Sequence, residues 1–588
     1  MRPVGQDKLS SLLLKPAPTA CQHIGMSSKS RNILLLGSSG AAALETCRSL
    51  GEAGHRITIL RLSPERTPAD HSRYCAKSAH IGSLEWGVRQ YVAELLPFLR
   101  HGGYDYMVPV DDLACELTYC NYEVISSMTR VVGPNPDAFA IARDRFESLG
   151  VARSVGLSQP PTVLVKRGSE TPSEPLLPCL VKPVVSTAIV DDEPQRFSTR
   201  EVRTADELDA KLRDDLPRVD VMLQAPIRGA CVGLGFCALD GQLLGVCVTS
   251  YLHNVVSNGR CSSYRTVKEV TPRLLSIVET IARQFRWTGF MMMECQATDA
   301  DLWLTDLRCR PWDSMSLDIF AGVDFPKLLI DAFEGYDRPR ICLPTKAVYT
   351  RDLQMDIAWM FRQLTKGAGA KLFAGWIASL GRVLIGRERF DIERLDDPVP
   401  GIRQVDTYIR RLASKIGVHF SSAFRDATTA RPEVGMLSRA STVLVVCKGN
   451  INRSIVAEQL FKAHGFTRVQ SAGLLGMSGR RPSKLAEAYL RGRLGIDASK
   501  LRSQSVTRAL KEMSNVDIVL CFERRHVAEL AQRFPNLRGK LFLLSAVVPD
   551  KQRPLDIADP QGGSPALYLA CFRRIEKLVA DVAATADP

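Results

Sequence analysis

Apolar and polar residues near the start of the chain follow one another in a pattern that predicts a parallel β-α-β unit. The apolar run NILLLG at residues 32–37 is followed by a Ser-Ser-Gly turn and by a stretch with helical spacing of apolar residues, 41–54. A second apolar run, ITILRL at residues 57–62, completes the unit. Because Gly37 and Gly40 do not complete a G-x-G-x-x-G pattern, we expect tight packing at this turn rather than a phosphate site.

The pattern changes several times along the rest of the chain. Short alternating strands such as 221–226 and 303–307 indicate an α+β region, and a helix-prone region ends in a linker at 428–432. The apolar run VLVV at 443–446 is typical of a buried parallel strand. We therefore expect a multidomain α/β protein with five segments: a loose tail at 1–30, an α/β subdomain at 31–134, an α+β domain at 135–340, a helical extension and linker at 341–437, and a final α/β domain at 438–588.

Composition limits the classes of protein to which the chain can belong. Of its 588 residues, 45% are hydrophobic and 24% are charged, which excludes wholesale disorder and a fibrous architecture. The 16 cysteines include no Cys-x-x-Cys pair, as expected for reduced thiols in a cytosol. The longest apolar stretch, residues 372–381, is far shorter than the roughly 20 residues that cross a membrane. We therefore expect a cytoplasmic protein without a membrane partner.

The net charge of +14 is concentrated in one part of the chain. Residues 441–588 hold 23 Lys and Arg against 13 Asp and Glu, a net charge of +10. A basic excess confined to about a quarter of the chain indicates a local anionic ligand, so no nucleic acid partner is expected.

The motif with the most chemical content is VLVVCKGNINRSIVAEQLF at residues 443–461. A buried strand leads into Cys447, and Arg453 and Ser454 begin an amphipathic helix. The backbone N–H groups between them can wrap around a phosphate in a loop made of Lys448, Gly449, Asn450, Ile451 and Asn452. These donors and the helix dipole would stabilise a thiolate on Cys447, the candidate nucleophile. Arg453 offers a planar fork to two phosphate oxygens, and Ser454 can donate to the departing thiolate.

A thiolate nucleophile of this kind needs a general acid that protonates the leaving oxygen. Asp559, which precedes Pro560 in a Pro- and Gly-rich stretch before the last predicted helix, is the candidate. The expected reaction forms a phosphocysteine on Cys447. Asp559 first protonates the leaving group and then activates the water that releases phosphate.

Together these residues resemble the low-molecular-weight protein tyrosine phosphatases. Cys447-x5-Arg453-Ser454, SAG at 471–473, DIVL at 517–520 and Asp559-Pro560 follow the family's order across 440–580. The resemblance implies a doubly wound parallel sheet and a cysteine-dependent phosphatase that needs no cofactor. It also implies a phosphorylated protein or a small aryl phosphate as substrate.

Three positions depart from that family's pattern. Asn452 stands where some members have a second cysteine, so their vicinal disulfide cannot form. Ile451 replaces the threonine of relatives that act on phosphoarginine, which favours an aryl phosphate. Gln561 replaces the aromatic residue that follows Asp-Pro, which leaves specificity for tyrosine open. Arsenate reductases of the same fold need two further cysteines, and only Cys521 lies in the relevant region, so that activity is a minor alternative.

The middle of the chain carries a dispersed set of residues suited to a nucleotide. Lys182 ends the apolar strand CLVKP and can reach phosphates, and QAPIRG at 224–229 can meet an adenine through its backbone. Glu294 and Asp306 fall on two neighbouring predicted strands, where two carboxylates would suit a Mg²⁺ ion that bridges nucleotide phosphates. Because alternate residues share a face of a strand, we expect Asp306, Arg308 and Arg310 to point the same way.

The order of these motifs resembles the ATP-grasp superfamily, in the branch close to carbamoyl-phosphate synthetase. The similarity covers about 30–340, with the first sheet as the preceding α/β subdomain. It implies binding of ATP and Mg²⁺ and the ligation of an unidentified carboxylate to an amine. The residues that it implies for ATP are Arg145, Lys182, Gln224, Ile227 and Arg310, and those for the metal are Glu294 and Asp306.

Two departures from the ATP-grasp pattern leave the activity of this region open. Arg145 stands where the family has lysine, and Arg308 puts a cation where a neutral asparagine ligand is expected. The chain is then either a bifunctional phosphatase and ligase, or a phosphatase joined to a non-catalytic nucleotide-binding regulatory module. A third alternative is mainly a ligase whose C-terminal domain removes phosphate from the product or a partner.

Overall fold

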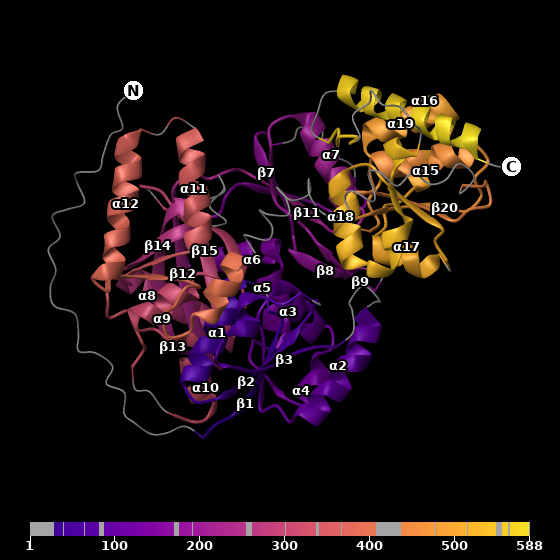
Figure 1. Ribbon diagram of the computed structural model, residues 1–588. Coiled ribbons are helices and arrows are strands. Elements are labelled where there is room, and N and C mark those ends of the chain that lie inside the picture. The colour runs from indigo at the N-terminus through magenta and orange to yellow at the C-terminus, as the bar shows by residue number, and fades with distance from the viewer. Residues whose placement is uncertain are drawn as a thin grey trace. The chain divides into compact units, whose positions relative to one another are not determined.

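The computed structural model describes residues 29–586 except for 39, 64, 82–87, 170–175, 191, 255–261, 300, 337–339, 366, 368, 407–436, 477, 514, 548–555 and 562–564. The expected linker at 428–432 and nearly all of the expected tail at 1–30 lie outside the described residues. The chain forms two compact units (Figure 1). One comprises Met1–Ile81, Val92–Pro160 and Ile227–Ile402, and the other comprises Gly82–Tyr91, Pro161–Pro226 and Arg403–Pro588.

The first unit opens with a parallel sheet of five strands in the order β3-β2-β1-β4-β5. These strands are β1 (Asn32–Leu36), β2 (Arg56–Arg61), β3 (Cys75–His80), β4 (Tyr106–Pro109) and β5 (Arg130–Val131). The helices beside them are α1 (Gly40–Glu52), α2 (Val88–Gly102), α3 (Asp112–Tyr119) and α4 (Tyr122–Ser126). Ile33 and Leu35 share a core with Leu44 of α1, so the alternating apolar positions of β1 fix the strand against its helix. The predicted β-α-β unit is confirmed.

The same unit contains a sheet of seven strands in the order β16-β15-β12-β13-β14-β17-β18, antiparallel except for the last pair. These strands are β12 (Ala230–Leu239), β13 (Gln242–Asn254), β14 (Ser262–Lys268), β15 (Gly289–Ala297), β16 (Leu302–Arg308), β17 (Tyr349–Arg351) and β18 (Glu388–Phe390). Alternate residues of β12 enter different cores: Phe236 packs with Ile277, whereas Cys237 lies in the core that contains Phe325.

The helices of this sheet pack against both of its faces. They are α5 (Pro136–Arg143), α6 (Arg145–Ser154), α8 (Pro272–Gln284), α9 (Met315–Ala321) and α10 (Phe325–Phe333). Two further helices, α11 (Leu353–Thr365) and α12 (Ala370–Leu384), form a helical hairpin between β17 and β18, within the region expected to be helical (Figure 1). No described helix is both long and apolar enough to cross a membrane.

The second unit contains an antiparallel sheet of four strands in the order β10-β7-β11-β6. Its strands are β6 (Thr162–Val165), β7 (Cys179–Pro183), β10 (Arg200–Val202) and β11 (Val221–Gln224), and β8 (Thr187–Val190) pairs with β9 (Glu193–Arg196) in a separate hairpin. Helix α7 (Ala205–Asp215) packs on β7 and β10, and Thr204 caps it by accepting from the backbone of Glu207.

The unit also contains a parallel sheet of four strands in the order β20-β19-β21-β22. Its strands are β19 (Val443–Cys447), β20 (Val469–Gly473), β21 (Ile518–Cys521) and β22 (Leu541–Leu543). Its α-helices are α15 (Arg453–Ala463), α16 (Lys484–Leu494), α17 (Val506–Glu512), α18 (Arg524–Arg533) and α19 (Pro565–Thr585).

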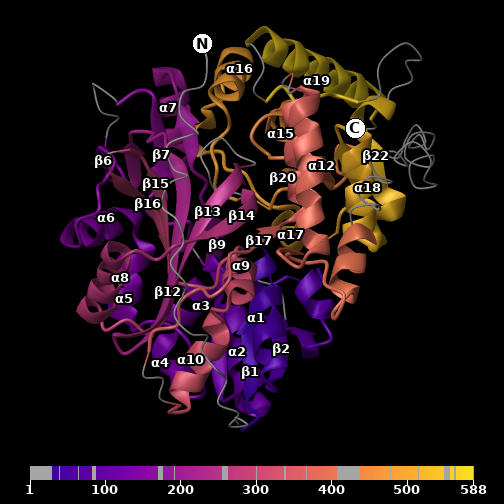
Figure 2. The same cartoon turned by 90° about the vertical axis from the view of Figure 1, so that its left-hand side faces the viewer.

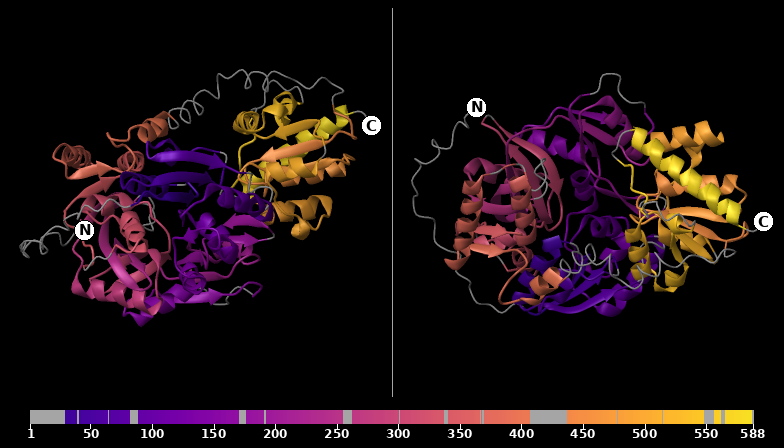
Figure 3. Two further views of the ribbon diagram at one scale, coloured as in Figure 1. Left: turned by 90° about the horizontal axis from the view of Figure 1, so that it is seen from below. Right: turned by 45° about the horizontal axis from the view of Figure 1, so that its top comes forward.

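Both faces of this parallel sheet are covered by helices (Figure 3). Val445 packs with α15, α16 and α19, whereas its neighbour Val446 packs with α17 and α18. The uninterrupted apolar run of β19 follows from this burial on both sides. The chain therefore has the expected α/β class: an α/β subdomain and α+β regions, followed by a doubly wound parallel sheet.

Candidate active site

The loop between β19 and α15 lies at the carboxyl end of the central strand of the C-terminal sheet. Cys447 is the last residue of β19, and Arg453 is the first of α15. Asn450 is fully buried and has a φ of 51°, a left-handed conformation that asparagine tolerates better than most residues. A Cβ on Gly473 would lie 3.0 Å from the carbonyl carbon of Gly449, so only glycine lets β20 approach the loop this closely.

The side chain of Asn450 holds the loop in this conformation. Its Nδ2 donates to Ser454 Oγ at 2.9 Å and to Ser471 Oγ at 2.8 Å. Its Oδ1 accepts from the backbone N–H of Gln504 at 2.8 Å. Ser471 in turn donates to Glu458 Oε2 at 2.6 Å. Three neighbouring segments therefore fix the loop before any ligand binds.

Cys447 is buried in this loop with two polar neighbours. Its Sγ lies 2.9 Å from Ser454 Oγ and accepts from the backbone N–H of Asn450 at 3.2 Å. Ser454 Oγ accepts from Asn450 and can direct its own proton to Cys447, which lies nearer than the Ala472 carbonyl at 3.5 Å. This geometry provides a hydrogen bond that would stabilise negative charge on the sulfur.

Arg453 is fully buried beneath the loop. Its Nη1 donates to Glu523 Oε1 at 2.5 Å and to the carbonyl of Ile557 at 2.7 Å, and its Nη2 lies 2.8 Å from Asp559 Oδ2. Its buried Nε has no hydrogen-bond partner within the described part of the chain. Burial alone would lower its pKa, but Cys447 and the two carboxylates raise that pKa overall. The guanidinium therefore stays charged and retains a donor for an anion.

Asp559 lies beside this arginine although it is more than 100 residues away in the sequence. Its side chain is about a quarter exposed, so it can meet both solvent and a bound phosphate ester. Gln561, two residues after Asp559, accepts from Asn452 Nδ2 at 2.8 Å and from the hydroxyl of Tyr568 at 3.2 Å. The structure therefore brings the predicted residues Cys447, Arg453, Ser454 and Asp559 into one site.

The remaining predicted loop residues differ in exposure. Lys448 is exposed, Gly449 and Ile451 are partly exposed, and Asn452 is buried. The exposed side of the loop thus carries a cation and an apolar side chain next to the site.

Glu523 is a site residue that the sequence analysis missed. Burial raises its pKa, but hydrogen bonds from Arg525 and Arg453 lower the pKa overall, so the carboxylate remains ionised. His526 lies 3.5 Å from it, and burial lowers the pKa of this histidine to about 3, so it carries no competing positive charge. Glu523 follows β21 at the carboxyl end of a strand next to β19. Parallel sheets place ligand-binding residues at that edge, a signal that could have identified it.

The predicted nucleotide-binding residues divide between the two units. Lys182 and Gln224 lie in the second unit, on the neighbouring strands β7 and β11. Lys182 Nζ donates to Gln224 Oε1 at 2.5 Å, and Gln224 Nε2 donates to Thr162 Oγ1 at 3.1 Å. Both side chains are buried. The sequence does not predict this hydrogen bond between them.

The predicted metal ligands lie in the first unit, and each is paired with an arginine. Glu294 of β15 and Asp306 of β16 are register partners. Arg308 Nη2 lies 2.8 Å from Glu294 Oε1, and Arg145 Nε donates to Asp306 Oδ1 at 3.0 Å. The negative charge of Glu294 raises the pKa of Arg308. Both carboxylates are thereby neutralised by cations of the protein itself.

These pairs do not fit the expected Mg²⁺ site. A dication would have to displace a guanidinium from each carboxylate, and hard cations need several free oxygen ligands. Within the described residues, no group of three or more His, Cys, Asp or Glu side chains is arranged to hold a metal ion.

Two further predicted ATP residues lie outside regular strands. Arg310 follows the end of β16, so the expectation that it shares a strand face with Asp306 and Arg308 is wrong. Beyond the strand the chain turns, and Arg310 Nε donates to Asp112 Oδ1 at 2.5 Å. Ile227 lies in the first unit, three residues after the end of β11, and is partly exposed.

The turn after β1 is closed by carboxylates. A Cβ on Gly37 would lie 2.5 Å from Asp111 Oδ2, and a Cβ on Gly40 would clash with Asp313 Oδ1. Asp313 also accepts from the backbone N–H of Ala42 at 3.3 Å. An anionic phosphate would be repelled here, so the expectation of tight packing is confirmed.

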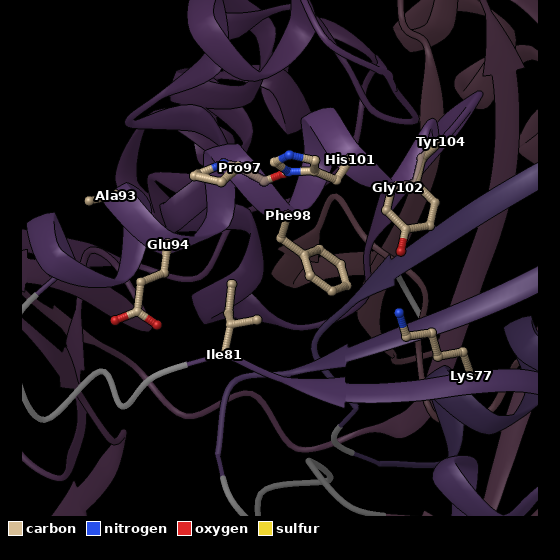
Figure 4. Close-up of a pocket in the computed structure, with 9 residues that line it drawn as sticks. All are labelled: Lys77, Ile81, Ala93, Glu94, Pro97, Phe98, His101, Gly102 and Tyr104. Carbon is tan, nitrogen blue, oxygen red and sulfur yellow. The ribbon is translucent and has the colours of Figure 1, made fainter.

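A pocket of about 560 Å³ lies in the first unit between β3 and α2 (Figure 4). Phe98 and Tyr104 stack with their ring centroids 5.8 Å apart, and Lys77 lies over the Phe98 ring. None of the predicted site residues lines this pocket. It is therefore separate from the chemistry expected of either site.

Comparison with known proteins assigns a family to the C-terminal part of the chain. Residues 442–587 match the family model described as low molecular weight phosphotyrosine protein phosphatase. The low molecular weight protein-tyrosine-phosphatase Wzb of Escherichia coli (strain K12) is 31% identical over 139 residues, which are 23% of this chain and 89% of Wzb. The protein-arginine-phosphatase of Bacillus subtilis (strain 168) is 30% identical over 147 residues, which are 24% of this chain and 93% of that protein.

Solved structures that resemble the chain cover a larger share of it than these relatives do, but at lower sequence identity. N5-carboxyaminoimidazole synthetase from Staphylococcus aureus, complexed with ADP, has 14% identity and a TM-score of 0.41 over 55% of this chain and 84% of the enzyme. L-amino acid ligase from Bacillus licheniformis has 12% identity and a TM-score of 0.41 over 55% of this chain and 79% of the ligase.

Proposed function

Since the chain belongs, through residues 442–587, to the low molecular weight phosphotyrosine protein phosphatase family, we propose that this part hydrolyses aryl phosphate monoesters, on a phosphorylated protein or a small molecule. The observation that carries the proposal is the convergence of Cys447, Arg453 and Asp559 around one loop. A buried arginine with an unsatisfied donor, next to a cysteine, suits a phosphate that is attacked at phosphorus.

In the first step of the proposed reaction, the Cys447 thiolate attacks phosphorus and forms a phosphocysteine. The ester bond breaks, and the leaving oxygen takes a proton from Asp559. Arg453 and the backbone N–H groups of the loop stabilise the charge on the non-transferred oxygens.

In the second step, Asp559 accepts a proton from water, and the water oxygen attacks phosphorus. The bond between sulfur and phosphorus breaks, and the electron pair returns to Cys447. Ser454, 2.9 Å from the sulfur, donates a hydrogen bond to the departing thiolate. Inorganic phosphate leaves, and both catalytic groups return to their starting protonation states.

The minor alternative, arsenate reduction, is disfavoured by the state of its second cysteine. Cys521 is fully buried, and burial raises its pKa well above the ordinary value. A thiol held in its neutral form is a poor nucleophile for the thiol–disulfide exchange that arsenate reduction would require.

An Asp559→Asn variant tests the role of the acid. The amide that replaces the carboxyl group cannot donate a carboxylic proton, so we expect kcat for phenyl phosphate, a poor leaving group, to fall by about 10²-fold or more. For a leaving group as acidic as 2,4-dinitrophenol the loss should be several-fold smaller, because that phenolate needs no proton. Steady-state rates over a series of aryl phosphates measure this. Equal losses across the series would remove Asp559 as the acid.

For the N-terminal two-thirds we propose nucleotide binding without magnesium-dependent ligation. This second proposal is supported by the pairing of Arg308 with Glu294 and of Arg145 with Asp306. An arginine can contact a phosphate directly, so the cations would replace the metal as counter-charges for a nucleotide. Ile227 and Arg310, which belong to the same unit, are the other predicted contacts there.

An Arg308→Asn variant tests whether the arginine excludes the metal. We expect ATP to raise the melting temperature of the wild-type protein to the same degree with and without Mg²⁺. In the variant, Glu294 loses its cation, so stabilisation by ATP should become dependent on Mg²⁺. Thermal shift with ATP, with and without EDTA, measures this. Release of ADP by the wild type with Mg²⁺ and any carboxylate and amine pair would instead establish ligase activity.

A further inference from the structure

The helical hairpin of α11 and α12 turns its apolar side outward. On α12, Phe373, Ile377 and Leu384 are 43%, 48% and 90% exposed. Their spacing puts them on one face of the helix, together with the exposed Ala374, Ala378 and Gly381. On α11, Ile357, Phe361 and Leu364 form a second exposed apolar row. Figure 2 shows α12 along its whole length on the side turned to the viewer.

The inner side of the hairpin is held by polar contacts. Trp376 Nε1 donates to Asp356 Oδ2 at 2.7 Å, and Ser379 Oγ accepts from Arg351 Nη2 at 2.7 Å. Arg382 Nη1 donates to the hydroxyl of Tyr264 at 2.8 Å. A helix in water normally presents its polar side to the solvent and its apolar side to the core. In α12 this arrangement is inverted. Its exposed apolar side would therefore be stabilised by contact with an apolar partner.

Apart from the buried Asp356, the charged residues of the hairpin are all basic. Residues 357–387 contain five basic residues and no acidic residue. Lys371, in the first turn of α12, and Arg387, three residues beyond its end, are exposed. Lys371 lies at the border of the apolar face of α12. Cations at such borders can extend their charged ends toward lipid headgroups while their methylene stems cover apolar surface.

We propose that this hairpin, residues 353–384, binds the surface of an anionic lipid membrane. The exposed rows of the two helices offer apolar side chains to the acyl region, and the basic residues meet the headgroups. A second copy of the chain is a poorer fit, because a symmetric contact would bring the cations of both copies together without acidic partners. The expectation of no membrane partner rested on the lack of a spanning segment, and an interfacial hairpin needs none.

Vesicle flotation of the full-length protein tests this proposal. We expect binding to vesicles of equal parts phosphatidylglycerol and phosphatidylcholine, and much less to phosphatidylcholine alone. Phe373→Ser with Ile377→Ser should weaken binding by about tenfold for each side chain. Lys371→Gln with Arg387→Gln should weaken it by about fivefold for each charge, and added salt should do the same. Leu395→Ser, which removes a fully exposed leucine outside the hairpin, is the matched control.

Each outcome decides the proposal. Loss of binding in both hairpin variants but not in the control, with unchanged hydrolysis of p-nitrophenyl phosphate, supports it. A wild-type protein that ignores anionic vesicles overturns it. Sedimentation without lipid adds a separate outcome: a dimer that dissociates in the Phe373 and Ile377 variant would assign the surface to a second copy instead. Hydrolysis is measured on each variant, so failure of the phosphatase proposal would appear independently.

Discussion

A Cys447→Ser variant should lose at least about 10⁴-fold of the turnover of p-nitrophenyl phosphate, because its hydroxyl is not ionised near neutral pH and is a far weaker nucleophile than a thiolate. The side chains differ little in size, and Asn450, Ser454 and the backbone donors stay in place. The loop should therefore keep its shape and bind phosphate. Initial rates, together with the melting temperature and its rise with inorganic phosphate, separate loss of chemistry from loss of folding.

Cys521→Ala is the matched control for this variant. Cys521 ends the strand next to β19, as Cys447 ends β19 itself, but it lies in the core and outside the loop. Its removal should leave turnover within a few-fold of the wild type. If Cys447→Ser kept substantial activity, or if both variants lost activity equally, a phosphocysteine on Cys447 would be ruled out.

Replacing Arg453 with lysine should lower kcat/KM by about 10³-fold or more, the range seen when an arginine that stabilises a transferring phosphoryl group is lost. Lysine keeps the positive charge, but it lacks the planar fork that can bond Glu523 and two phosphate oxygens at the same time. A large part of the loss should appear in kcat, because the guanidinium binds the phosphoryl oxygens more strongly in the transition state than in the bound substrate. Steady-state kinetics with p-nitrophenyl phosphate measures both parameters.

Arg525→Lys provides the comparison for Arg453→Lys. Arg525 also contacts Glu523, with Nη2 donating to Oε1 at 2.9 Å, but its side chain is exposed. We expect this change to cost only a few-fold. A small loss in the Arg453 variant would mean that the charge alone suffices and that the fork has no role.

The phosphatase loop could be predicted because its determinants are local. Cys447, Arg453 and Ser454 lie within one strand-loop-helix segment, whose apolar run and spacing specify the turn. Glu523 could not be identified in the same way. Its role depends on β21 pairing beside β19, a long-range contact that the pattern of a single strand does not specify.

In the middle of the chain, the sequence predicts the strands but not the ion pairs between them. The sequence placed Glu294 and Asp306 on neighbouring strands, and the structure pairs them in register. It did not reveal that Arg145, about 160 residues before Asp306, would occupy that carboxylate. The motif predicts Arg308 only at the position of a metal ligand, and the cross-strand geometry shows it paired with Glu294. Ion pairs between distant segments depend on the fold rather than on the motif.

The orientation of α12 likewise could not be predicted from the sequence. Its apolar spacing predicts a helix with one apolar face, and such a face usually packs on the core. Here Trp376 and Ser379 point inward because the buried groups Asp356 and Arg351 need polar partners. The need of these buried groups on α11 and β17 for polar partners thus turns the apolar face outward.

The central claim, a phosphocysteine on Cys447, is tested most directly by trapping the intermediate. The protein is mixed with p-nitrophenyl phosphate, quenched in acid within milliseconds, digested and analysed by mass spectrometry. We expect the mass of one phosphoryl group on the peptide that contains Cys447, and none on that peptide from Cys447→Ser. Hydrolysis with no phosphoryl group on Cys447, or with one on another residue, would contradict the account.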